Sequence, residues 1–304
     1  MGMIVDIQNL RKTFGPIVAV DGVSFTVGKG EVLGFLGPNG AGKSTTMKMI
    51  TGFLTPTSST VRICGHNIDD QPIEAKKRIG YLPEGAPAYQ DMTPSSFLTF
   101  IGEMRGYRGT TLKQTVSATV EKVNLQSVMI QSIEPLSKGF KRRVVLAQAI
   151  LHDPEVLILD EPTDGLDPNQ KYEVRSLIRA MAQEKAIILS THVLEEVHAV
   201  CSRAMIIANG KVVSDGTPSE LEGKAPTHHT VLITISGVDP LAAYNHLMRV
   251  KGIKKIEEQG KDADLVQFRI YPDDGQWILP DISQCAREQG WEVRELYTDR
   301  GQLD

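Results

Sequence analysis

A glycine-rich loop that ends in lysine and serine is the residue pattern in this chain with the clearest chemistry. It follows the pattern G-x-x-x-x-G-K-[ST]. Such a loop wraps backbone N–H groups around nucleotide phosphates, its lysine adds a positive charge near the β- and γ-phosphates, and its serine hydroxyl ligates Mg²⁺. The predicted phosphate-binding residues are Gly37, Pro38, Asn39, Gly40, Ala41, Gly42, Lys43, Ser44 and Thr45.

Two adjacent carboxylates, Asp160 and Glu161, follow the short apolar segment Val156–Leu159. In an open α/β sheet, the carboxyl end of such a strand lies beside the phosphate loop. We therefore expect Asp160 to hold Mg²⁺, directly or through water, and Glu161 to polarise the attacking water.

The segments that must position these residues alternate between strands and helices. Val32–Leu36 is predicted to feed the loop as a buried strand, and Ser44–Ile50 leaves it as a helix with a partly positive N-terminus. Further buried strands and one helix are predicted at Val156–Leu159, Ala186–Leu189, Met205–Ala208 and Pro168–Gln183. This alternation indicates a parallel sheet covered on both faces.

Residues 4–36 favour strands, as shown by the period-2 alternation over Val23–Val27. Helical patterns begin at Thr93-Pro94, where Thr is a good N-cap and Pro suits the first helical position, and they continue to about Leu151. A helical insertion within an otherwise alternating chain is therefore expected.

Gly223–His229 is predicted to be a linker. Because no further metal-ligating side chain accompanies His228 and His229, a solvated loop is the favoured interpretation over a metal site. The segments that follow are Val231–Ile235, Leu241–Val250, Ile253–Glu257, Leu265–Ile270, Ile278–Glu288 and Val293–Tyr297. Their strand–helix–strand–strand–helix–strand order fits a small ferredoxin-like α+β domain.

Composition sets broader bounds. The chain has 304 residues, which suits one large domain or two ordinary ones, and its net charge of −4 argues mildly against general affinity for nucleic acid or anionic membranes. Its three cysteines have no metal or disulfide spacing and are expected to be free thiols in a reducing cytosol. No secretory signal appears, and no apolar run approaches the roughly 18 residues that span a bilayer. We therefore expect any membrane role to go through a partner.

From residue 4 to about residue 222 the chain resembles the nucleotide-binding subunits of ABC transporters. The motifs that carry the resemblance are Gly37–Thr45, Leu136–Phe140, Leu159–Thr163, Gly165–Pro168 and Ser190–His192, in that order. The resemblance implies an ABC-type P-loop α/β fold with an antiparallel β subdomain and a helical subdomain at about 85–150. It divides the chain into an ATPase domain (1–222), a linker (223–229) and a C-terminal domain (230–304).

The resemblance also implies a role for each further motif. Ser137 and Gly139 would face the γ-phosphate of ATP held by a second copy, so that two copies enclose two ATP molecules head to tail. His192 would hydrogen-bond the γ-phosphate and hold the attacking water, and Asp167 would shape the dimer seam. Phe14 stands where the family places an adenine-stacking aromatic residue, with a core phenylalanine as the alternative.

The chain departs from the family pattern at three positions. Lys138 and Phe140 replace the usual Gly and Gln of the signature, a variant that we associate with an exporter-like branch. Glu84 replaces the usual Gln; it can ligate Mg²⁺ through oxygen and is predicted to be catalytic, but it adds negative charge. The basic cluster Lys138, Lys141, Arg142 and Arg143 favours helix-surface charge near bound phosphate over nucleic-acid binding.

The predicted function is an ATP-binding and ATP-hydrolysing subunit, with Mg²⁺, that powers a membrane ABC transporter, with export as the direction implied by resemblance. Its partners would be a second copy of itself and a separate polytopic permease that docks on Glu84–Gln90 and the insert Met92–Ile133, and no nucleic acid is expected. The chain would be cytoplasmic and peripheral on the inner face of the cell membrane.

A soluble ABC-type mechanoenzyme acting on nucleic acid or ribosomes is the alternative; those proteins usually show tandem ATPase units or long coiled coils, neither of which appears. A regulatory ATP sensor is disfavoured because Glu161 and His192 are both present.

Overall fold

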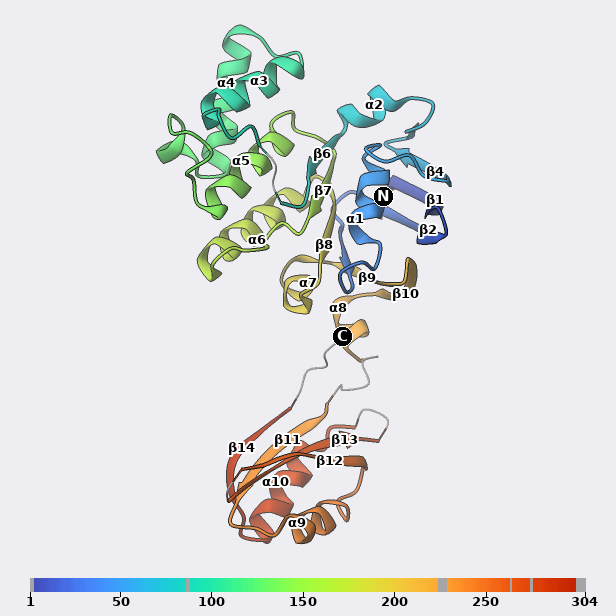
Figure 1. Ribbon diagram of the computed structural model, residues 1–304, viewed down its shortest axis with the longest axis vertical. Helices are drawn as coiled ribbons and strands as arrows, with labels where there is room; N and C mark the ends of the chain where they lie inside the picture. The colour runs from blue at the N-terminus through green and yellow to red at the C-terminus, as the bar shows by residue number, and fades with distance from the viewer. Residues whose placement is uncertain (1–2, 86–87, 224–228, 263, 274–275, 299–304) are drawn as a thin grey trace. The chain divides into compact units, whose positions relative to one another are not determined.

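The computed structural model describes residues 3–85, 88–223, 229–262, 264–273 and 276–298 (Figure 1). The chain divides into two compact units, Met1–Pro218 and Ser219–Asp304. The residues predicted to act on phosphates and Mg²⁺ all belong to the first unit.

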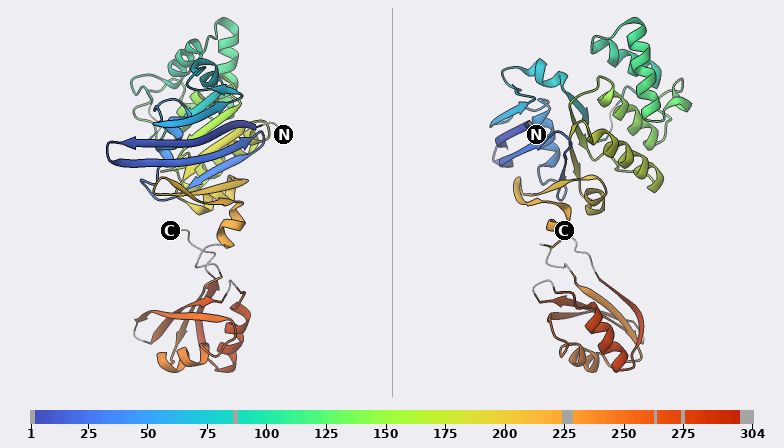
Figure 2. Two further views of the ribbon diagram at one scale, coloured as in Figure 1. Left: turned by 90° about the vertical axis from the view of Figure 1, so that its right-hand side faces the viewer. Right: turned by 180° about the vertical axis from the view of Figure 1, so that it is seen from behind.

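The first unit contains two sheets. Its strands are β1 (Met3–Phe14), β2 (Ile17–Gly28), β3 (Val32–Leu36), β4 (Ser58–Ile63), β5 (His66–Asn67), β6 (Ile79–Leu82), β7 (Val156–Asp160), β8 (Ala186–Thr191), β9 (Arg203–Ala208) and β10 (Lys211–Gly216). An antiparallel sheet has the order β2-β1-β4-β5, and its two long strands lie side by side in Figure 2. A six-stranded sheet has the order β10-β9-β3-β8-β7-β6, in which all pairs are parallel except β9 with β10.

Helices connect the strands of this unit. They are α1 (Lys43–Ile50), α2 (Pro72–Lys77), α3 (Pro94–Met104), α4 (Gly109–Lys122), η1 (Gln126–Val128), α5 (Lys138–Ile150), α6 (Pro168–Ala182) and α7 (Leu194–Val200), followed by α8 (Pro218–Gly223) at the boundary of the two units. The predicted start of α3 is confirmed: Thr93 caps it and forms a capping box with Ser96. The helical insertion is therefore α3, α4, η1 and α5.

The six-stranded sheet is buried on both of its faces, as expected for strands without alternating polarity. Val156 and Ile158 of β7 join a core that also contains α1 and the antiparallel sheet. Leu157 and Leu159, which point the other way, join a core formed with α3, α5 and α6. Figure 1 shows the two sets of elements on opposite sides of the sheet. The sequence-based prediction of a parallel sheet between two layers is confirmed.

The second unit is a four-stranded antiparallel sheet with two helices. Its elements are β11 (Val231–Ser236), α9 (Pro240–Leu247), β12 (Ile253–Asp262), β13 (Leu265–Pro272), α10 (Leu279–Glu288) and β14 (Glu292–Thr298), and the sheet order is β12-β13-β11-β14. Alternate residues of β11 and β13 pack against both helices in one core. The predicted order of strands and helices is therefore present.

Three observations bear on the remaining expectations. Cys64, Cys201 and Cys285 are free thiols. Most of the predicted linker, including His228, lies outside the described residues, while the ring of His229 packs edge-on against Trp277, with 4.9 Å between the ring centroids. In the described part of the chain, no helix combines the length and the apolar character needed to cross a membrane.

Candidate functional site

The glycine-rich loop connects β3 to α1, as predicted, and two of its glycines are required by space. A Cβ at Gly37 would lie 2.2 Å from the carbonyl oxygen of Ile207. Gly42 caps α1 with a φ of 105°, and a Cβ there would lie 2.6 Å from the carbonyl oxygen of Ala19. A side chain at either position would displace backbone, so the loop closes tightly over the helix N-terminus.

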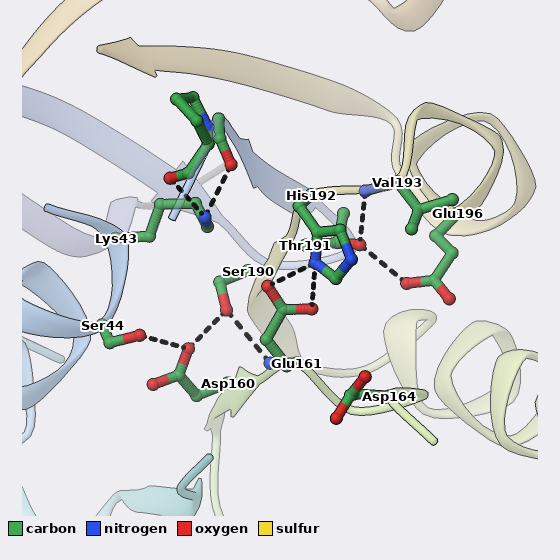
Figure 3. A network of polar contacts seen from close by, with 12 residues as sticks. Lys43, Ser44, Asp160, Glu161, Asp164, Ser190, Thr191, His192, Val193 and Glu196 are labelled. Atoms are coloured by element: carbon green, nitrogen blue, oxygen red, sulfur yellow. Dashed lines mark hydrogen bonds and ion pairs between the residues drawn. The ribbon is translucent and has the colours of Figure 1, made fainter. Parts of the chain in front are cut away.

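Lys43 and Ser44 begin α1 and point toward the loop and toward β7 (Figure 3). The Lys43 side chain is buried, and its Nζ donates to the carbonyl oxygens of Gly37, at 2.6 Å, and Pro38, at 3.1 Å. This places a positive charge within the curve of the loop, beside the orphan N–H groups of the helix. The combination is an anion site suited to phosphate.

Asp160, at the end of β7, is fully buried. Its Oδ1 accepts hydrogen bonds from the hydroxyls of Ser44, at 3.1 Å, and Ser190. Its Oδ2 is buried and has no hydrogen-bond partner. A buried carboxylate oxygen without a partner is costly, and a cation bound beside Ser44 would satisfy it. The donor set therefore fits Mg²⁺, which commonly takes one or two carboxylates together with substrate phosphates.

Glu161 and His192 lie against each other at the carboxyl ends of β7 and β8 (Figure 3). The His192 Nδ1 is 3.1 Å from both carboxylate oxygens of Glu161. The Glu161 backbone N–H donates to the Ser190 hydroxyl at 3.0 Å, so Ser190 connects the Asp160 carboxylate to the backbone of Glu161. Glu161 has a φ of 49°, a left-handed conformation that is uncommon outside Gly, Asn and Asp. Such conformations cluster at functional sites, where the surroundings hold them.

The electrostatics of Glu161 suit a proton acceptor. Burial raises the pKa of its carboxyl group above the ordinary range of a glutamate, while the hydrogen bond and charge of His192, and the charge of Lys43, act to lower it. Burial is the largest of these effects. A base whose pKa is raised toward neutrality accepts a proton more readily in a transition state.

Ser137, Gly139 and Asp167 form a second group, at the N-termini of α5 and α6. The Ser137 hydroxyl caps α5 and accepts from the Phe140 N–H at 3.4 Å. The Asp167 carboxylate caps α6 and accepts from the Gln170 N–H at 2.9 Å. The Gln170 side chain packs onto Gly139, where a Cβ would meet it at 2.4 Å. Asp167 thus has a structural role as a helix cap, and its role at the dimer seam stays a prediction.

Phe14 and Glu84 are the two remaining predicted site residues. Phe14 ends β1 and is 48% exposed, with the Lys12 Nζ at 5.1 Å from its ring centroid. The alternative of a core phenylalanine is therefore wrong. Glu84 is exposed just after β6. Its charge, like that of Asp160, contributes to the raised pKa of the buried Tyr81 phenol, although burial is the larger cause.

Arg142 corrects one interpretation of the sequence. It was expected to be a helix-surface charge, but it is 5% exposed, and its guanidinium donates to the Asp164 carbonyl oxygen at 3.1 Å. Burial lowers its pKa, while the charges of Asp164, Glu161, Asp160 and Glu84 act to raise it. Arg142 is therefore a buried cation that connects α5 to the segment after Glu161. Arg142 lies three residues before the buried Val145, so the two share a face of α5. The helical register was therefore the one sequence signal that could have indicated the burial of Arg142.

Among the residues that the structure describes, no three or more His, Cys, Asp or Glu side chains form a metal cage. The predicted residues instead fall into two clusters and two single positions: Lys43, Ser44, Asp160, Glu161 and His192 together, Ser137, Gly139 and Asp167 together, and Phe14 and Glu84 apart. Sequence reasoning placed Ser190 in the motif Ser190–His192 but gave it no role of its own.

Comparisons with known proteins give consistent results. Residues 20–164 match the family model described as ABC transporter. The chain is 36% identical over 244 residues to the Nod factor export ATP-binding protein I of Paraburkholderia xenovorans, covering 80% of each protein. It resembles the solved ATP-binding subunit of an ABC transporter with a TM-score of 0.66 and 28% identity, covering 72% of this chain and 92% of that one. A bacterial ABC transporter cassette solved as a dimer shares the fold, with a TM-score of 0.66 at 21% identity over 70% of this chain and 98% of that one.

Proposed function

This chain belongs to the family of ABC transporter ATP-binding proteins, and on that premise we propose that it powers a membrane exporter by ATP-driven closure of a head-to-tail dimer. As a member of this family it binds and hydrolyses ATP. The direction of transport rests on its similarity to a protein named for Nod factor export.

The observation that carries the proposal is the convergence of β3, β7 and β8 on one point. Their carboxyl ends place the phosphate loop with Lys43, the carboxylates of Asp160 and Glu161, and His192 beside one another. Phosphoryl transfer needs positioning and charge stabilisation more than covalent chemistry. In our proposal Lys43 and the loop hold the β- and γ-phosphates, Glu161 accepts a proton from the attacking water, and His192 orients that water against the γ-phosphate.

Mg²⁺ fits this site on the grounds given above for Asp160. Ser44 and Asp160 would hold it, with Glu84 as a further oxygen ligand. When bound, the ion neutralises developing charge on the phosphate oxygens. The protein residues supply the remaining steps: Ser190 fixes Asp160 and the Glu161 backbone, and Lys43 balances negative charge. Phe14, exposed at the end of β1, supports adenine stacking.

A second copy would complete the site. Ser137 and Gly139 stand at the N-terminus of α5, which is an anion site by its free N–H groups and its dipole. They form a cluster of their own, apart from the phosphate loop, and Asp167 holds the start of α6 beside them. We propose that these residues contact the γ-phosphate bound by the partner copy.

A groove of about 880 Å³ supports docking of a membrane partner. It lies between α1, the segment after β6, and the helices α3 and α5, and its lining includes Phe53, Tyr89 and Glu84. Phe53 is 78% exposed, and the Tyr89 ring packs edge-on against Phe97 and Phe100 at about 6 Å. An exposed aromatic groove of this kind is typical of an interface. Its lining includes Glu84, Ala88 and Tyr89 of the loop that was predicted to dock the permease.

The test uses the full chain co-expressed with a polytopic membrane protein encoded in an adjoining reading frame. The pair is solubilised in detergent and purified through a tag on the membrane protein. We expect the wild-type chain to co-purify and Phe53→Asp to be lost, while its own ATP hydrolysis is retained. Val213→Asp is the control, since Val213 is 65% exposed and lies outside both the groove and the insert Met92–Ile133, so this variant should still co-purify. Co-purification of Phe53→Asp at the wild-type level would contradict the docking surface, and absence of a membrane partner would contradict the transport role.

Three further assignments belong to the proposal. The order β12-β13-β11-β14, with α9 and α10 packed in one core, supports a ferredoxin-like C-terminal domain. We place the ATPase domain at 1–222, the linker at 223–229 and the C-terminal domain at 230–304. The chain would reside in the cytoplasm, held to the inner face of the cell membrane by the permease.

A further inference from the structure

Glu196 is a buried carboxylate to which no role has yet been given. It lies in the first turn of α7, and it is 4% exposed. Its Oε2 accepts a hydrogen bond from the Thr191 hydroxyl at 2.7 Å, and its Oε1 accepts one from the Thr163 hydroxyl. Both threonines are also buried. One side chain therefore joins the segment that follows β7 to the segment that ends β8.

The carboxylate also has two basic neighbours on α6. The Lys171 Nζ is 3.4 Å and the Arg175 guanidinium 3.9 Å from its Oε1. A buried charge needs both partners of opposite sign and hydrogen bonds to its oxygens. Glu196 has both, so the fold is built to hold a charged carboxylate at this position.

The two threonines stand close in sequence to the proposed catalytic pair. Thr163 lies two residues after Glu161, and Thr191 lies directly before His192. The Thr191 hydroxyl also accepts from the Val193 N–H at 3.1 Å, so it fixes the backbone on the far side of His192 (Figure 3). The two segments are therefore connected before the catalytic pair through Ser190, at the pair by the Glu161–His192 contact, and beside it through Thr163–Glu196–Thr191.

We propose that Glu196 is a positioning residue for ATP hydrolysis: it fastens the segment carrying Glu161 to the segment carrying His192, so that base and water-orienting group keep their mutual geometry. The inference rests on the roles proposed above for Glu161 and His192. The His192 imidazole is bonded to the Glu161 carboxylate at 3.1 Å, and its side chain is half exposed. Without the connection through Glu196, the backbone on either side of the exposed imidazole is held less firmly, and a displacement of about 1 Å in an active site can lower a rate about 100-fold.

Glu196→Gln in the full chain tests this inference. It keeps the shape of the side chain and removes its charge and one acceptor. Because Glu196 contacts neither the phosphate loop nor Asp160 in the described hydrogen bonds, we expect kcat to fall tenfold or more, with KM and the affinity for a fluorescent ATP analogue within about twofold. The control is Glu195→Gln, the adjacent residue, whose side chain is 78% exposed and pairs with Arg175 at 3.1 Å. It makes the same change in charge and should leave kcat within twofold.

Two substitutions of Thr191 test the same inference if Glu196→Gln does not fold. Thr191→Ser keeps the hydroxyl and should retain most of kcat, while Thr191→Val removes it and should lower kcat as Glu196→Gln does. Circular dichroism at the assay temperature restricts the comparison to folded protein. Unchanged kcat in Glu196→Gln, or equal kcat in the Ser and Val variants, would overturn the inference. Glu161→Gln is assayed in parallel: if it retains wild-type turnover, the proposed role of Glu161 has failed, rather than the positioning role alone.

Discussion

Glu161→Gln should separate catalysis from folding in this protein. The substitution keeps the side-chain volume and the contact with His192 but removes the proton acceptor. General-base catalysis is worth about 100- to 10,000-fold, so we expect turnover to fall at least about 100-fold, which corresponds to about 2.7 kcal/mol or more in the barrier.

Glu161→Gln should lower turnover without lowering the stability of the fold. Burial raises the pKa of Glu161, which means that the fold disfavours its charged form relative to water. At neutral pH a glutamine therefore avoids the burial of a charge, and the melting temperature should stay equal or rise. The left-handed φ of 49° at this position is shared by both residues and does not change the comparison.

The assay is release of inorganic phosphate under saturating ATP and Mg²⁺, with thermal unfolding measured on the same samples. Glu155→Gln is the matched control, since Glu155 immediately precedes the other end of β7 and pairs with Arg78 at 2.5 Å. Turnover of the Glu161 variant within tenfold of wild type would refute the assignment of the base. A melting temperature lowered by several degrees would refute the conclusion that burial disfavours the charged form of Glu161.

Three further outcomes are expected. Lys43→Ala should abolish ATP binding measured by calorimetry, because it removes the buried charge within the phosphate loop; unchanged affinity would refute that role. Ser137→Arg introduced into Glu161→Gln should prevent the ATP-dependent dimer on size-exclusion chromatography with light scattering, while one ATP still binds per chain; a dimer that persists would contradict the shared site. His152 has a pKa lowered to about 4 by burial, and its Nε2 lies 3.0 Å from the Ile79 carbonyl oxygen. Because the unfolded chain binds this proton below about pH 6.5, the stability it contributes should be lost between about pH 6.5 and pH 4, and His152→Gln should flatten that part of the curve.

The sequence predicted the layered core and the phosphate loop because both depend on local patterns. A run of apolar residues such as Val156–Leu159 has no polar face, so it must lie between two layers, and the carboxylates after it must lie at the sheet edge. The capping of α3 by Thr93 and the glycine spacing of the loop are equally local.

Contacts between distant segments could not be predicted in the same way. Arg142 lies in a cluster of four basic residues, and its burial against Asp164 depends on how α5 packs, which the charge pattern does not reveal. The acceptor role of Glu196 is similar, because Glu195 and Glu196 are alike in sequence and only the register of α7 buries the second. Phe14 is exposed because it pairs with Ile17 at the turn of the β1–β2 hairpin. The alternation of polar and apolar residues did not show where this turn lies.

Gly139 is constrained in two ways: the Gln170 side chain packs on it within the chain, and its N–H is proposed to face the ATP of the partner copy. A methyl group there would collide with an amide 2.4 Å away, whatever the partner copy contributes. That amide is the end of a flexible side chain, so it would swing away from the added methyl group while the Gln170 backbone stays anchored by Asp167. Loss of activity on replacing this glycine therefore would not by itself report on contact between copies, because the Gln170 side chain of an isolated chain would already be displaced; the seam must be probed from Ser137 instead.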